Sequence, residues 1–168
     1  MQMLNRYFTP FALILILSAI YFSQPDPRDY KISLAILLAS ILINWWLSKN
    51  MYRIPILARN IRKIQVWLNY LWAVPLFYLL QPYWGPMWLL FVMAPVTAAL
   101  YFRFWQTLAT SVVISSTMLT IYYYRGVFDG GPAAGMACVE ACFIIIFSLF
   151  IHGLAQTALR LRDANVGR

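Results

Sequence analysis

Charged side chains are scarce in this sequence, and acidic ones most of all. Its 168 residues include five Asp and Glu, one His and two Cys, against 13 Lys and Arg. Two cysteines are too few for a disulfide framework, and such an apolar chain has the wrong composition for a disordered tail. The basic residues also form no solvated stripe of the kind that nucleic-acid modules carry, so we expect no nucleic-acid partner.

Enzyme signatures are also missing. The chain has no HExxH, no phosphate-cradling glycine loop, no GxSxG and no pair of membrane aspartates. Cys138 and Cys142 lie four residues apart on one helical face, without the further Cys and His ligands of a zinc site, and are expected to be packing residues. We therefore expect a non-catalytic chain with no metal and no cofactor.

Apolar residues, by contrast, are abundant. They make up 62% of the chain, only 11% is charged, and the mean hydropathy is +0.69. A fold of this size keeps much of its surface exposed, so its core could not hide that surplus from water. The composition predicts a membrane protein.

Several apolar stretches approach the length of about 20 residues that an α-helix needs to cross a bilayer. The sequence therefore predicts an all-α, polytopic protein with one six-helix transmembrane domain over residues 1–168. Pro75, Pro82, Pro86 and Pro95 crowd the third and fourth stretches, which favours a hairpin of two kinked spans and leaves a re-entrant segment as the alternative. The six stretches cover about 7–23, 31–48, 66–81, 87–102, 105–124 and 132–157.

The distribution of Lys and Arg predicts the orientation, because cytoplasmic loops collect these residues. Arg28, Lys31 and Arg125 fall in the connections on one side. The other ten fall on the opposite side, so both termini are expected in the cytoplasm. Those ten are Arg6, Lys49, Arg53, Arg59, Arg62, Lys63, Arg103, Arg160, Arg162 and Arg168.

A basic loop is expected over residues 49–65, with room for a short helix on the cytoplasmic surface. Ile54, Ile56, Leu57 and Ile61 could face lipid there while the cations face anionic headgroups. The alternative is a docking surface for a cytoplasmic protein. The candidate lipid or partner surface comprises Lys49, Arg53, Arg59, Arg62, Lys63, Arg160 and Arg162.

Glu140 is the most informative single residue. It lies about eight residues into the last stretch, roughly 12 Å from the outer end at helical rise, where an unpaired carboxylate is expensive. The small residues around it, including Ala137 and Ala141, allow another helix to approach closely. Glu140 is a candidate ligand contact, proton-sensitive switch or ion-path carboxylate. The structural alternative is a hydrogen bond to a Ser or Thr of the stretch 105–124.

Further polar residues line these two stretches. Ser148, His152 and Gln156 recur every four residues, and Thr117 and Thr120 belong to a hydroxyl-rich set on the preceding stretch. Such side chains can pack a helix bundle or line a polar ligand cavity. We retain all five, with Glu140, as candidate ligand or switch residues.

Two segments carry a resemblance to a known family. Residues 82–102, PYWGPMWLLFVMAPVTAALYF, combine an outer turn with a proline-interrupted helix, and residues 151–163, IHGLAQTALRLRD, form the end of the last helix. This pattern, over about the last half of the chain, resembles the membrane-embedded input region of bacterial sensor histidine kinases and diguanylate cyclases. The resemblance implies a bacterial inner-membrane protein. It implies no kinase or cyclase activity for the residues up to Arg168.

The resulting expectation is a sensory, signal-transducing module that passes a change in helix packing to a cytoplasmic output partner. Membrane lipids and a protein are its expected partners, and a homo-oligomer is compatible with the sequence. An accessory or scaffold subunit of a larger inner-membrane complex is the first alternative. A small substrate-binding component of a transporter is the second.

Overall fold

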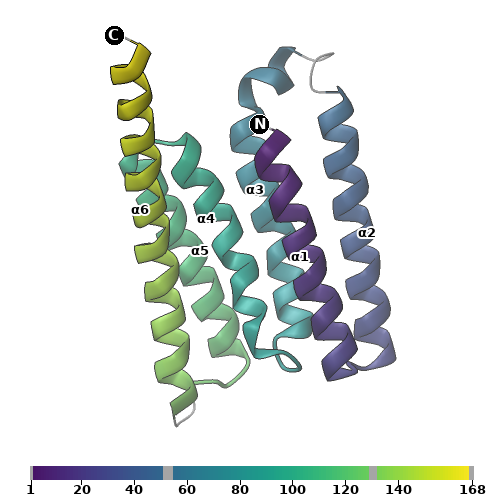
Figure 1. The fold of residues 1–168 in the computed structure, drawn as a ribbon. Coiled ribbons are helices and arrows are strands. Elements are labelled where there is room, and N and C mark those ends of the chain that lie inside the picture. Colours follow the sequence, from purple (N-terminus) through teal and green to yellow (C-terminus); the bar gives the residue numbers. More distant parts are fainter. Residues whose placement is uncertain (1, 51–54, 129–131, 167–168) are drawn as a thin grey trace. The chain divides into compact units, whose positions relative to one another are not determined.

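The computed structural model describes residues 2–50, 55–128 and 132–166, and within these ranges it is helical with no strand (Figure 1). The all-α prediction is confirmed. In order, the elements are α1 (Gln2–Ser23), α2 (Pro27–Asn50), α3 (Pro55–Leu80), the 3-10 helix η1 (Gly85–Trp88), α4 (Leu89–Tyr101), α5 (Phe104–Tyr124) and α6 (Pro132–Val166).

Prolines mark the starts of three of these helices. Pro27, Pro55 and Pro132 are the first residues of α2, α3 and α6. A proline in this position loses no helical hydrogen bond, because the first N–H groups of a helix have no intrahelical acceptor. Pro75 and Pro95 lie inside α3 and α4 instead, as membrane helices tolerate.

The chain divides into two compact units, which we describe separately: an N-terminal unit, Met1–Met93, and a C-terminal unit, Ala94–Arg168. In the N-terminal unit, α1, α2 and α3 run beside one another in alternating directions (Figure 1). Its interior contains large apolar side chains, and the rings of Phe77 and Phe91 meet edge to face at 5.0 Å.

The C-terminal unit comprises the remainder of α4 with α5 and α6, and α5 packs along α6 (Figure 1). The turn after α5 places Gly126 at φ 72°, a left-handed conformation that glycine adopts without the Cβ penalty. At the other end of α5, Arg103 caps the helix through a capping box with Gln106. The connections at the two ends of α5 are short, which places α5 next to α4 and α6 in this unit.

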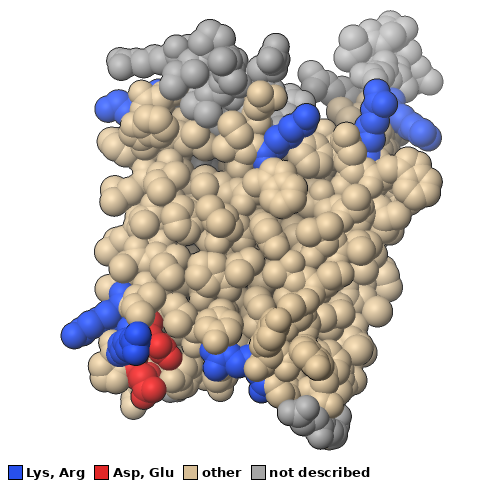
Figure 2. All heavy atoms as spheres, turned by 180° about the vertical axis from the view of Figure 1, so that it is seen from behind, with Lys and Arg blue, Asp and Glu red and all other residues tan. Residues whose placement is uncertain are grey.

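Three helices are long and apolar enough to cross a membrane, over Pro27–Leu47, Phe104–Tyr124 and Pro132–Leu161. Uncharged side chains dominate the face drawn in Figure 2. Large apolar side chains are exposed on both units, for example Trp45 at 61% and Trp105 at 75%. Exposure on this scale is expected of a surface in contact with lipid rather than water. The chain therefore has the character of a membrane protein.

The expected basic loop is the main difference in helix boundaries. Instead of a loop over 49–65, α2 continues to Asn50 and α3 already begins at Pro55, so most of this segment is helix continuous with α3. Hydropathy located only the apolar part of α3, because the residues Arg59 to Lys63 interrupt the apolar pattern without interrupting the helix. The other five stretches coincide with helices to within a few residues, except that α6 runs on to Val166 rather than ending near 157.

Candidate functional site

A hydrogen bond between two ionisable side chains joins α5 to α6. The Tyr122 hydroxyl donates to Oε2 of Glu140 over 2.7 Å. Tyr122 is buried, and Glu140 is half-buried. Glu140 therefore has a partner on α5, as the structural alternative required, but the partner is a tyrosine rather than the expected Ser or Thr.

The direction of helical side chains explains why these two residues meet. Side chains lean toward the N-terminus of their own helix. In the antiparallel α5–α6 pair, Tyr122 near the end of α5 leans back along that helix, while Glu140, deeper in α6, leans toward the start of α6. The two side chains thus point toward each other, although their backbones lie at different levels along the helix pair. Sequence spacing alone does not reveal this difference in level.

Small residues bring the two backbones close beside this pair. Ala137 and Ala141 of α6 are buried, and the Ser115 hydroxyl of α5 donates to the carbonyl oxygen of Ala141 over 3.2 Å. A side chain as short as serine can reach a neighbouring helix backbone only where the helices are in close contact. Ala133 and Gly135, nearer the start of α6, are exposed and take no part in this contact.

His152 occupies a second polar position in the same unit. The residue is 7% exposed, and its Nδ1 lies 3.0 Å from the carbonyl oxygen of Ala99 on α4. A carbonyl oxygen can only accept, so Nδ1 is the donor in this contact. His152 thereby ties α6 to α4, and Phe104 stands 6.1 Å away between ring centroids.

The other predicted ligand or switch residues do not join Glu140. Ser148 is buried but donates to Ile145 of its own helix, and Gln156 is exposed. Thr117 and Thr120 donate to the carbonyls of Val113 and Ser116 on α5. The structure thus separates the six candidates into a Glu140 position, a His152 position, three residues that bond within their own helices, and the exposed Gln156.

The structure describes the candidate basic residues to three different extents. Lys49, Lys63 and Arg160 are exposed, and Nζ of Lys49 stands 5.1 Å from the centre of the Trp45 ring, within cation–π range. Arg53 lies outside the described residues. Only the helical backbone is described for Arg59, Arg62 and Arg162.

A third polar group lies in the N-terminal unit, at the start of α2. The Tyr83 hydroxyl lies 3.2 Å from a carboxylate oxygen of Asp26 and 3.3 Å from one of Asp29. Loss of solvation raises the pKa of the Tyr83 phenol above its ordinary 10.0. A backbone hydrogen bond at Asp26 lowers this pKa, whereas the carboxylates of Asp26 and Asp29 raise it. The phenol therefore stays protonated and holds the turn after α3 to the start of α2.

Metal and thiol chemistry finds little support in the described part of the chain. No three His, Cys, Asp or Glu side chains gather there in a way that could hold a metal ion. Cys138 and Cys142 are free and exposed, so the expectation that they are packing residues is wrong. Each follows a buried alanine, Ala137 or Ala141, by one residue and so lies about 100° around α6 from it.

Comparison of the chain with protein-family models, with curated proteins and with solved structures finds no match.

Proposed function

We propose that this chain is a non-catalytic sensory module of the bacterial inner membrane, in which α6 passes a change in helix packing to a cytoplasmic output partner. The observation that carries the proposal is the Tyr122–Glu140 hydrogen bond. An ionisable pair within two apolar helices is costly to keep without a role, and its protonation or displacement changes how α5 and α6 pack. The likeness to sensor-kinase and cyclase input regions supports the same function.

The length of α6 supports the relay. Its 35 residues amount to about 50 Å at helical rise, against a hydrocarbon core of about 30 Å. The residues from Gln156 to Arg160 are exposed, as a segment leaving the bundle requires. A continuous helix connects Glu140 to the last described residue, so a shift at the pair reaches that end without an intervening loop.

The proposal includes six membrane crossings with both termini in the cytoplasm. Beyond the three long apolar helices, α1 and the η1–α4 segment contain shorter apolar helices, Pro10–Phe22 and Gly85–Tyr101. The crowding of Lys and Arg into alternate connections supports the orientation. Single cysteines at Lys63 and Gly85, in a variant lacking Cys138 and Cys142, test it. An impermeant maleimide added to intact cells should label the cysteine at 85 and spare the one at 63, and the reverse pattern contradicts the proposed orientation.

Purification from the native cells in nanodiscs, with mass spectrometry of proteins retained at fixed stoichiometry, tests the function. Retention of a kinase, cyclase or regulator is expected, and Glu140→Gln should change the activity of that partner at unchanged membrane insertion. Thr120→Val is the matched control, because Thr120 is exposed and bonds only within α5. Equal partner activity with the wild-type protein and with Glu140→Gln would remove the pair from the mechanism.

The accessory-subunit alternative rests on the exposed tryptophans, Trp45, Trp46, Trp67 and Trp105, which suit a protein contact as well as the membrane interface. Recovery of the chain inside a large enzyme or envelope complex would favour this function over the sensory one.

A further inference from the structure

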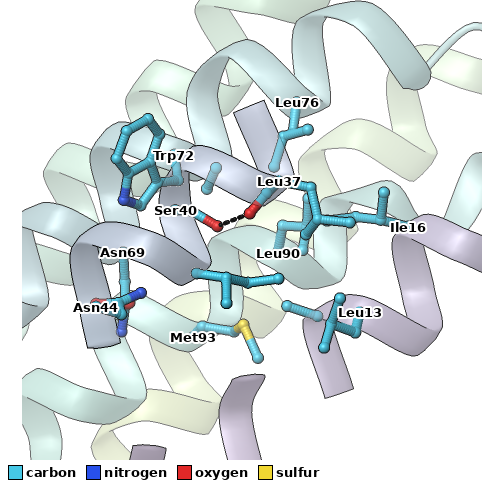
Figure 3. A pocket seen from close by; sticks show the side chains of 13 residues that line it. Leu13, Ile16, Leu37, Ser40, Asn44, Asn69, Trp72, Leu76, Leu90 and Met93 are labelled. Carbon is cyan, nitrogen blue, oxygen red and sulfur yellow. Dashed lines mark hydrogen bonds between the residues drawn. The ribbon is translucent and has the colours of Figure 1, made fainter. Parts of the chain in front are cut away.

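The N-terminal unit contains a pocket with one polar end. It has a volume of about 60 Å³ and lies among α1, α2, α3 and the first residues of α4. Trp72, Asn69 and Asn44 lie together at one end in Figure 3, and apolar side chains such as Ile16 and Leu13 lie at the other. All of the lining residues belong to the N-terminal unit, so the pocket is independent of the Tyr122–Glu140 pair.

The polar end contains a buried hydrogen-bond donor that lacks an acceptor among the described residues. Nε1 of Trp72 is buried and has no hydrogen-bond partner in the part of the chain that the structure describes. Because an indole N–H can only donate, the missing partner must be an acceptor. The half-buried Asn44 and Asn69 bring two amides from neighbouring helices. The Ser40 hydroxyl already donates to the carbonyl of Leu37 over 2.8 Å and so can accept from a bound group. An acceptor in the pocket would complete this set.

The occupant must be uncharged and small. No ionisable side chain is among the described residues that line the pocket, and an unpaired charge there would not be compensated. A cavity holds a water molecule once its volume exceeds roughly 10–15 Å³ and polar partners are present, so this one has room for several waters or for one small polar group. Asn44 lies within the apolar span of α2, where bulk water cannot satisfy its amide.

We propose that this pocket binds a neutral group whose oxygen accepts a hydrogen bond from Trp72, with Asn44 and Asn69 as its further partners. The oxygen can come from water or from the ester of a membrane lipid. Both sources present the same acceptor chemistry to the indole. The experiment below distinguishes them.

The test observes the Trp72 indole N–H by nuclear magnetic resonance in the full-length protein, labelled at tryptophan and held in phosphatidylcholine nanodiscs. Trp72→Phe identifies the resonance. Cross-relaxation of this proton with water supports the proposal with water as the source. Cross-relaxation with lipid glycerol or first-methylene protons, together with a shift when diester lipid is replaced by diether lipid, supports it with lipid as the source.

Variants test the remaining partners. Asn44→Leu and Asn69→Leu should remove the cross-peak or weaken it at least threefold, whereas Asn50→Leu should retain it, because the Asn50 amide is exposed and donates to the Trp46 carbonyl. Unchanged resonances of the other indoles show that a variant has folded. Loss of the cross-peak in at least one of the two pocket variants supports the proposal. Retention in both, or no cross-peak to water or lipid in the wild-type protein, overturns it.

Discussion

The N-terminal unit and the C-terminal unit differ in the contacts that hold the helices of each unit together. In the N-terminal unit the largest fully buried side chains include Phe77, Phe91 and Leu80. The helices α5 and α6 bury the small residues Ala137 and Ala141 as well as Met118 and Ile144, and hydrogen bonds cross between these two helices. Both solutions suit lipid, where apolar residues gain little from leaving the solvent and helices associate through close packing and polar contacts.

The difference suggests a division of roles. A core of interlocked large side chains resists rearrangement, because every alternative packing leaves voids. Small residues present a smoother surface, and a few hydrogen bonds then select one arrangement among several of similar energy. On this basis we expect the N-terminal unit to be the rigid part and the α5–α6 contact to be the adjustable one.

Phe77→Ala should have the largest effect on stability. It deletes one ring of the edge-to-face pair with Phe91 and leaves a cavity, so we expect a loss of about 2–4 kcal/mol, since lipid reduces the transfer component of a buried-ring deletion. Hydrogen exchange read by mass spectrometry should rise in α3 and η1. An equal rise in α5 and α6 would show that the two units open together and would break the comparison.

Ala141→Leu should come next, at about 1–3 kcal/mol, because a larger side chain cannot fit where the Ser115 hydroxyl reaches the α6 backbone. Exchange should then rise in α5 and α6 and stay unchanged in α3. Ala158→Leu makes the same substitution at an exposed position of α6 and should cost little. Similar losses for both substitutions would mean that close packing at Ala141 is unimportant.

Tyr122→Phe should cost about 0.5–2 kcal/mol, the range for hydrogen bonds between membrane helices. Tyr123→Phe removes a hydroxyl from an exposed neighbour and is the matched control. A double-mutant cycle with Glu140→Leu, read by unfolding in mixed detergent micelles, isolates the pair. Additive losses would indicate that the hydrogen bond contributes nothing to the α5–α6 contact.

The smallest expected effect on stability concerns Tyr83. The pKa of its phenol is higher in the folded protein than in the unfolded chain, so folding favours the neutral phenol. This stabilisation is complete below pH 10 and is lost as the pH rises through the pKa of the folded protein. The difference in phenolate absorbance between wild type and Tyr83→Phe reports this pKa, and Asp26→Asn with Asp29→Asn should lower it. No change in the double variant would exclude the two carboxylates as a cause.

The sequence predicted the helices well because hydropathy and proline position depend on short stretches of chain. It failed at Arg59 to Lys63, where a helix continues through charged residues. It also failed to predict the Tyr122 partner of Glu140, because that contact depends on the offset between two helices and on the lean of their side chains. Because helical side chains lean toward the N-terminus, an aromatic residue near the end of α5 was a better candidate for the partner of Glu140.

The pocket of the N-terminal unit was missed for a different reason. Asn44 and Asn69 are isolated polar residues in apolar surroundings, a signal that was present in the sequence, yet nothing in their spacing shows that they share a cavity with Trp72. Conversely, the four-residue period of Ser148, His152 and Gln156 predicted one polar face, whereas Gln156 lies beyond the buried part of α6. Periodicity predicts which residues share a helix face. It does not predict how far along the helix that face is buried by neighbouring helices.

The uninterrupted course of α6 has a mechanical consequence. His152, bonded to the Ala99 carbonyl, holds α6 to α4, and from His152 to Val166 there are about 14 residues, a lever arm of about 21 Å at helical rise. A tilt of roughly 5° about His152 moves the tip of this arm by about 2 Å. A small angular change of α6 at His152 is thereby enlarged at the far end of the rod.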